Sequence, residues 1–171
     1  MMTARRLEAL RRVAEGEPPM TKVALDGLND PEGIRRQLQA ELERHIKAKE
    51  GFSGLMERIQ KVTAANASRA ARIAQTEKTR AVNGSRVGKA IGEYLKEYEH
   101  ARQSHQKRPE LPRFQWVHTN AALEPRHSHI ALSGTVREVG SEFLPGLKYP
   151  GDPDAPASET INCHCYVRRV R

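Results

Sequence analysis

The distribution of proline and glycine divides this sequence into two regions with different folding possibilities. After Pro112 the chain is interrupted repeatedly by residues that end helices and strands: Pro125, Gly134, Gly140, Pro145, Gly146, Pro150, Gly151, Pro153 and Pro156. Only short elements fit between these positions. Residues 114–118 and 160–170 have the composition of strands. The sequence therefore predicts a small, loop-rich strand region at the C-terminal end.

The region before Pro112 has the periodicity of amphipathic helices. Residues 3–15 have a short helical pattern, and Asp30-Pro31 supplies a helix cap followed by proline at the first helical position. The helix after this cap has apolar residues every four positions: Ile34, Leu38, Leu42 and Ile46. A longer helical pattern opens at Ser53 and continues to about Val82, and Asn83-Gly84 separates it from a further helix that ends near Tyr98.

These patterns together predict an α+β fold. An N-terminal helical arm with one long helix precedes the small C-terminal strand region, and we divide the chain into a helical arm over residues 1–52 and a second domain over residues 53–171. The apolar seam of the long helix includes Leu55, Ile59, Val62 and Ile73. We expect a small domain to leave part of this seam uncovered, where it would mediate self-association or binding to a protein partner.

Composition narrows the class of protein further. With 37% apolar and 5% aromatic residues in 171, a generously buried all-β sandwich is disfavoured. No apolar run approaches the ~20 residues that span a bilayer, and the first residues lack the apolar core of a secretory signal. We expect a soluble protein made in a cytosol, without a membrane partner.

A basic stripe is predicted on one face of the long helix, formed by Arg58, Lys61, Arg69, Arg72 and Arg80. Between residues 58 and 90, Glu77 is the single acid. Such a stripe favours sequence-independent, salt-sensitive binding to DNA phosphates. A solvated helix face without a ligand is an equal alternative.

Two short palindromes contain residues that bind metals. In an extended strand, residues two apart face the same way, so each of His127-Ser128-His129 and Cys163-His164-Cys165 can present two ligands to one side. His127, His129, Cys163 and Cys165 would then form a closed, tetrahedral, structural zinc site. The alternative is that the two cysteines are buried thiols; a disulfide between them is disfavoured, because it would close a very small loop.

Glu77 is anomalous because it falls on the apolar stripe of the long helix. A buried carboxylate must be paired. Glu77 either anchors Arg126 or a basic group of a partner, or the helix has left the core by that turn, or Glu77 pairs locally with Arg80.

The order of motifs in the second domain resembles the phage Mu F-like minor head proteins, also called phage head morphogenesis proteins. The resemblance runs from Arg69 to near Val170 and rests on Arg72-Ile73-Ala74-Gln75-Thr76-Glu77, Arg80, Asn83, Trp116, Glu124-Pro125-Arg126-His127-Ser128-His129, Leu132, Gly134, Phe143, Pro145, Tyr149-Pro150-Gly151-Asp152-Pro153 and Glu159-Thr160-Ile161-Asn162-Cys163-His164-Cys165. His129 matches the family's histidine and His127 does not. His164 stands where the family usually has arginine between the cysteines.

This resemblance implies a non-enzymatic minor component of a tailed-phage head. Such a protein acts near the portal or capsid protein during assembly in the host cytoplasm, stays in the virion head and can contact packaged DNA. The rival hypotheses are a metal-dependent nuclease or hydrolase that uses His127 and His129, with Glu124 or Glu159 as its base, and a plain DNA-binding module. The sequence contains none of the P-loop, dinucleotide-binding, nucleophile-elbow or zinc-protease motifs.

Overall fold

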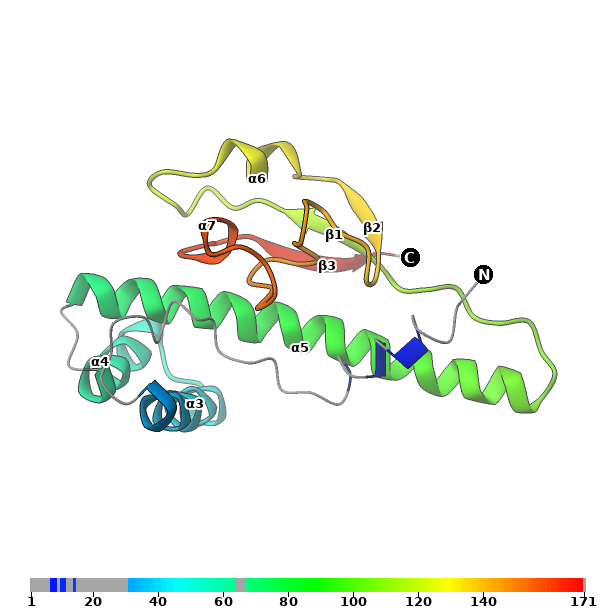
Figure 1. Cartoon of the computed structure of the whole chain (residues 1–171), viewed down its shortest axis with the longest axis horizontal. Coiled ribbons are helices and arrows are strands. Elements are labelled where there is room, and N and C mark those ends of the chain that lie inside the picture. Colours follow the sequence, from blue (N-terminus) through cyan, green and yellow to red (C-terminus); the bar gives the residue numbers. More distant parts are fainter. Residues whose placement is uncertain (1–6, 9, 12–13, 15–30, 64–66, 171) are drawn as a thin grey trace.

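The fold is organised around one long helix that touches both a helical pair and a small sheet. The computed structural model describes residues 7–8, 10–11, 14, 31–63 and 67–170. The long helix α5 (Ala67–Gln103) runs the length of the molecule, with α3 (Pro31–Ala48) and α4 (Phe52–Thr63) beside its first half and the strands on its other side (Figure 1). The predicted α+β class is confirmed. The predicted helix over residues 3–15 falls largely outside the described residues.

The sheet consists of three short antiparallel strands in the order β2-β1-β3. β1 (Arg113–Val117) lies in the centre, between β2 (Val136–Glu138) and β3 (Tyr166–Val170), and Trp116 pairs with Val167. Two short helices, α6 (His127–Ala131) and α7 (Ala157–Thr160), interrupt the loops between the strands. The strand predicted over 160–170 therefore begins later, at Tyr166, and β2 was not predicted.

Two hydrophobic clusters occupy the two sides of α5. The larger cluster joins α5 to the sheet and includes Val87, Ile91, Trp116, Phe143 and Val167. The smaller cluster joins α3, α4 and the start of α5 and consists of Leu38, Leu42, Leu55, Ile59, Ala70, Ile73 and Ala74. The predicted boundary between residues 52 and 53 falls at the start of α4, after its first residue, and separates α3 from α4 although both contribute to one cluster.

The apolar seam predicted on a single helix over 53–82 is divided between two helices. α4 ends at Thr63 and α5 begins at Ala67, and the intervening residues 64–66 lie outside the described part. Leu55, Ile59 and Ile73 are all buried, because α4 packs against α5 and α3 packs against α4. The seam is therefore covered at these three residues, contrary to the prediction of an uncovered surface, and Val62 is partly buried against the same cluster.

The predicted break at Asn83-Gly84 is also wrong, since α5 continues through both residues. Glycine costs a helix interior only ~0.5–1 kcal/mol, which tertiary contacts can offset. Asn83 supplies such contacts, because its buried side chain binds the backbone of β3. Among the described residues, no helix is long and apolar enough to cross a membrane.

Candidate metal centre

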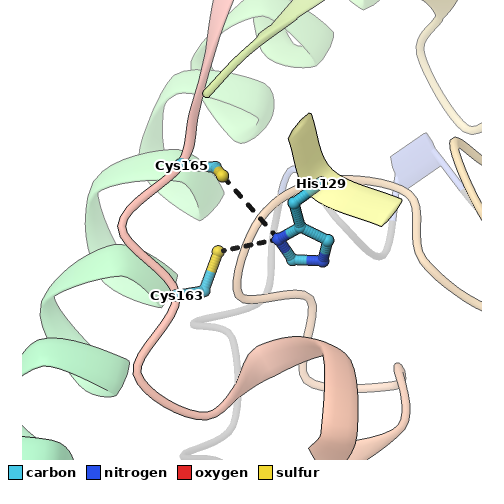
Figure 2. A group of neighbouring side chains, drawn as sticks. All are labelled: His129, Cys163 and Cys165. Carbon is cyan, nitrogen blue, oxygen red and sulfur yellow. Dashed lines mark hydrogen bonds between the residues drawn. The ribbon is translucent and has the colours of Figure 1, made fainter. Parts of the chain in front are cut away.

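Three buried side chains from distant parts of the chain converge beside the sheet. His129 lies on α6, and Cys163 and Cys165 lie on the segment that leads into β3 (Figure 2). Their exposed fractions are 2%, 2% and 5%. Nδ1 of His129 is 3.6 Å from Sγ of Cys163 and 3.7 Å from Sγ of Cys165. The three ligand atoms all lie within 4.8 Å of one another, so this group could bind a metal ion.

The distances within this group fit the ligand spacing of a tetrahedral zinc site. With Zn–S near 2.3 Å and Zn–N near 2.0–2.1 Å, a tetrahedral angle separates nitrogen from sulfur by about 3.6 Å. Figure 2 shows one ring nitrogen of His129 facing both sulfur atoms. A single lone pair on this nitrogen accepts well from only one S–H, whereas a metal ion between the three atoms contacts all of them.

Polar side chains of α5 hold the backbone of the cysteine segment in place. Thr79 and Gln75 both donate hydrogen bonds to the carbonyl of Cys163. Asn83 donates to the carbonyl of Cys165, and its Oδ1 accepts from the Val167 N–H at 2.9 Å. These contacts fix the backbone so that Cys163 and Cys165 face the same side, as the extended spacing predicts.

Glu159 orients the histidine from its far side. Nε2 of His129 lies 2.9 Å from Oε2 of Glu159, which belongs to α7. A ligating histidine ordinarily donates its other ring N–H to a carboxylate or carbonyl in this way. The bond places the proton on Nε2 and leaves the lone pair of Nδ1 directed at the two sulfur atoms.

The aromatic residues around the group keep it dry. The Trp116 ring packs edge-on against the His129 ring with centroids 5.0 Å apart, and Phe143 packs against Trp116. Trp116 is fully buried. A low-dielectric surrounding strengthens the attraction between thiolates and a divalent cation.

The two thiols have pKa values shifted in opposite directions. A hydrogen bond from Cys163 lowers the pKa of Cys165 to about 5. The same bond and burial raise the pKa of Cys163 above its ordinary value. In the absence of metal the pair therefore holds one proton, and a metal ion that binds both sulfurs displaces it.

His127 is not part of the group, and the extended conformation predicted for residues 127–129 is wrong. These residues form the first turn of α6. Side chains two positions apart on a helix point in nearly opposite directions, about 200° apart. His129 therefore points into the core, whereas His127 is exposed.

The five residues of the predicted basic stripe do not form one exposed surface. Arg58 binds Glu41 and Glu50 within the helical pair and lowers the pKa of Glu50. Arg80 is 5% exposed. Lys61 and Arg72 remain exposed and Arg69 is partly buried, on two different helices. Of the five predicted DNA contacts, Arg58 and Arg80 thus have internal structural roles.

Glu77 is fully buried and pairs with Arg80. Nε of Arg80 lies 2.6 Å from Oε2 of Glu77, so the predicted local pairing is confirmed, whereas the idea that the helix has left the core is wrong. Arg126 does not anchor Glu77. It donates instead to the carbonyls of Ser158 and Ile161 and so connects the start of α6 to α7.

Sequence reasoning missed the role of the polar residues on α5. Gln75, Thr79 and Asn83 recur every four positions, which places them on one helical face. This spacing was a signal that a polar face of the helix is buried against backbone. The sequence does not reveal which backbone segment it meets.

Comparison with known proteins matches one segment of the chain to a curated protein. A segment of 74 residues is 35% identical to the uncharacterized protein YqbB of Bacillus subtilis (strain 168), and the match covers 40% of this chain and 24% of that protein. The chain thus corresponds to about a quarter of the length of this relative. No protein-family model matches the chain, and no solved structure matches it significantly.

Proposed function

We propose that this protein is a minor head protein of a tailed phage or prophage, which acts at the portal or capsid protein during head assembly. One observation carries this proposal beyond the sequence resemblance. The motif residues that resemble the Mu F-like proteins are scattered over the second half of the chain, yet many of them meet in one buried junction between α5 and the C-terminal region: Glu77, Arg80, Asn83, Trp116, His129, Gly151, Asp152, Cys163 and Cys165.

This junction explains why such a set of residues would occur together. Asn83 binds β3, Arg80 pairs with Glu77, and the backbone of Gly151 lies directly against Arg80. These motif residues therefore fill structural positions in one packing arrangement. Such a tightly packed domain offers a fixed surface for assembly with other proteins.

The metal in this proposal is a structural zinc ion bound by His129, Cys163 and Cys165. Sulfur and imidazole ligands suit zinc, and the site joins α6 to the segment before β3. The region it joins has short strands and many loops, and a bound metal would contribute directly to its folding free energy.

The hydrolase alternative has less support from the geometry. A catalytic metal needs an open position for water and substrate, whereas the three ligands here are at most 5% exposed. Glu159 is already bonded to His129, and Glu124 is exposed on a loop. We therefore propose a non-enzymatic role.

The proposal is tested on particles produced from the genome that encodes this chain. Mass spectrometry of purified heads should find the protein at a few per cent or less of the major capsid protein, and deletion of the gene should reduce the yield of DNA-filled heads. A protein absent from particles, together with an unchanged particle yield after deletion, contradicts the head role.

Contact with packaged DNA is a separate part of the proposal. The exposed Lys61 and Arg72 are the remaining candidates, with Arg69 beside them. The double variant Lys61→Glu, Arg72→Glu should weaken binding to duplex DNA and reduce its salt dependence. Lys96→Glu, Arg102→Glu, which changes the same charge at exposed positions farther along α5, is the matched control. If both double variants weaken DNA binding equally, the overall positive charge of the protein attracts the DNA, and Lys61 and Arg72 have no special role.

A further inference from the structure

The group of His129, Cys163 and Cys165 provides three ligands, one fewer than a closed structural zinc site requires. The fourth position decides between a closed site and one that binds water. His127, the fourth ligand expected from sequence, is exposed, because its side chain points away from the side of α6 that carries His129. A fourth ligand presupposes the proposed zinc site and is independent of the head role.

The register of the sheet places another histidine opposite a ligand. β1 and β3 pair Trp116 with Val167 and Val117 with Tyr166. One step further, His118 comes opposite Cys165. The two chains stay adjacent beyond this point, since Oγ1 of Thr119 donates to the carbonyl of His164 at 3.0 Å. Directly opposed residues of antiparallel chains have Cβ atoms about 4.5–5.5 Å apart.

The alternation of the strand continues through His118 and sets the face on which its side chain lies. The N–H of Trp116 donates toward the β2 side, to the carbonyl of Thr135. The N–H of His118 points to the same side, where it donates to Oγ of Ser133. Residues two apart in an extended chain share a face. His118 therefore lies on the face of Trp116, where the Trp116 ring contacts the His129 ring.

Other nearby side chains fit the fourth position less well. His164 lies between the two cysteines, so the alternation that turns both sulfurs inward turns its side chain to the opposite face. Glu159 is bonded to Nε2 of His129 and thus sits behind the ligand. His118 is partly buried and continues the register of β1 opposite Cys165.

We propose that His118 is the fourth ligand and that the site is a closed Cys2His2 zinc centre. His118 is not within 4.8 Å of all three other ligand atoms, so its side chain rotates toward them when the metal binds. Two thiolates and two neutral imidazoles around Zn²⁺ give a site with no net charge, which suits burial.

The test compares two histidine variants of the full chain, His118→Ala and His127→Ala. Zinc affinity is measured by competition with a chromogenic chelator on reduced protein. We expect His118→Ala to lower the affinity by more than the about 10–100-fold that loss of an outer-shell partner costs. His127→Ala should leave the affinity within about twofold, because an exposed side chain away from the site contributes little.

Cobalt substitution gives a second readout that does not depend on affinity. Wild-type protein loaded with Co²⁺ should give the intense visible absorption of a tetrahedral site, and X-ray absorption should count two sulfur and two nitrogen neighbours. His118→Cys should retain tetrahedral coordination and increase the sulfur-to-cobalt charge-transfer band, because a third thiolate joins the site.

The outcomes test the assignment of His118 and the existence of the metal site separately. Wild-type zinc affinity in His118→Ala, or an unchanged cobalt spectrum in His118→Cys, overturns the assignment of His118 while the three-ligand site stands. A stoichiometry near zero in carefully reduced wild-type protein overturns the metal site itself. Neither result bears on whether the protein is found in phage heads.

Discussion

Asn83 binds β3 as a neighbouring strand would. Its Oδ1 accepts from the Val167 N–H at 2.9 Å, and its Nδ2 donates to the carbonyl of Cys165. β3 is an edge strand, since its partner in the sheet is β1 alone. A helix side chain thus satisfies two backbone groups that the sheet leaves open, and it does so next to the candidate metal ligands.

Asn83→Ala should destabilise the protein by ~2–6 kcal/mol, because it leaves two buried backbone groups of the β3 segment without partners at ~1–3 kcal/mol each. Denaturant unfolding measures the change. Ser85→Ala, at an exposed position of the same helix, should alter stability by no more than ~0.5 kcal/mol. Similar small effects at both positions would show that water replaces the Asn83 contacts.

Removal of one member of the buried pair of Glu77 and Arg80 should destabilise the protein strongly. Arg80→Met should cost ~3–5 kcal/mol, because the fully buried carboxyl group of Glu77 loses the guanidinium that lies 2.6 Å from it. The double variant Glu77→Gln, Arg80→Met should be less destabilised than the sum of the single changes, as unfolding by urea can establish. Arg72→Met, on the exposed face, is the control. Additive effects would argue against a direct coupling.

Two glycines should respond to alanine with opposite signs. Gly151 has φ of +79°, and a Cβ there would lie 2.7 Å from the Cα of Arg80. Backbone strain alone should make Gly151→Ala destabilise the protein by ~1–3 kcal/mol, and the close contact adds to this cost. Gly92 lies inside α5 with nothing within 4 Å of an added Cβ, and Gly92→Ala should stabilise by ~0.5–1 kcal/mol. Thermal unfolding of both variants checks the signs. A tolerated alanine at position 151 would contradict the close approach of this loop to α5.

Glu159 should tune the metal site without being a ligand. Glu159→Ala should lower zinc affinity about 10–100-fold, because His129 loses the partner that orients its ring. It should also reduce the loss of thermal stability that a chelator causes in the wild type. Glu142→Ala, at an exposed position, should change neither quantity. Complete loss of binding in Glu159→Ala would instead indicate that Glu159 is itself a ligand.

Without metal, the free energy of unfolding of the wild type should increase relative to that of the Asp152→Asn variant as pH falls. Burial raises the pKa of Asp152, although the N–H groups of Lys148 and Asp154 donate to its carboxylate and oppose the shift. The folded state therefore keeps a proton that the unfolded chain releases. This contribution is fully present below the unfolded pKa near 3.8 and is lost as pH rises through the higher folded value.

The measurement is the difference in unfolding free energy between wild type and Asp152→Asn, followed from about pH 3.5 to 7 with chelator present. The difference should shift in favour of the wild type as pH falls. Glu142→Gln, at an exposed position, is the control. A difference that shifts toward the variant in acid would mean that hydrogen bonds outweigh burial at Asp152.

Local patterns in the sequence were sufficient to predict the class of fold and part of the site. Apolar residues every three or four positions predict helices because the period of a helix is a local property, and the prolines and glycines after Pro112 limit the strands for the same reason. The i, i+2 spacing of Cys163 and Cys165 predicts a shared side, since the chain there is extended. The same rule failed at His127 and His129, where three residues do not reveal whether a segment is strand or helix.

The tertiary structure alone decided which faces meet. The stripe from Leu55 to Ile73 has the same periodicity whether the chain is one helix or two, and only the fold of α4 against α5 and α3 buries both halves. Burial likewise converted Arg80 from a predicted DNA contact into the partner of Glu77. The pairing of His118 with Cys165 follows from the register between β1 and β3. Such contacts join residues far apart in the chain, and periodicity within a segment carries no information about the segment it will face.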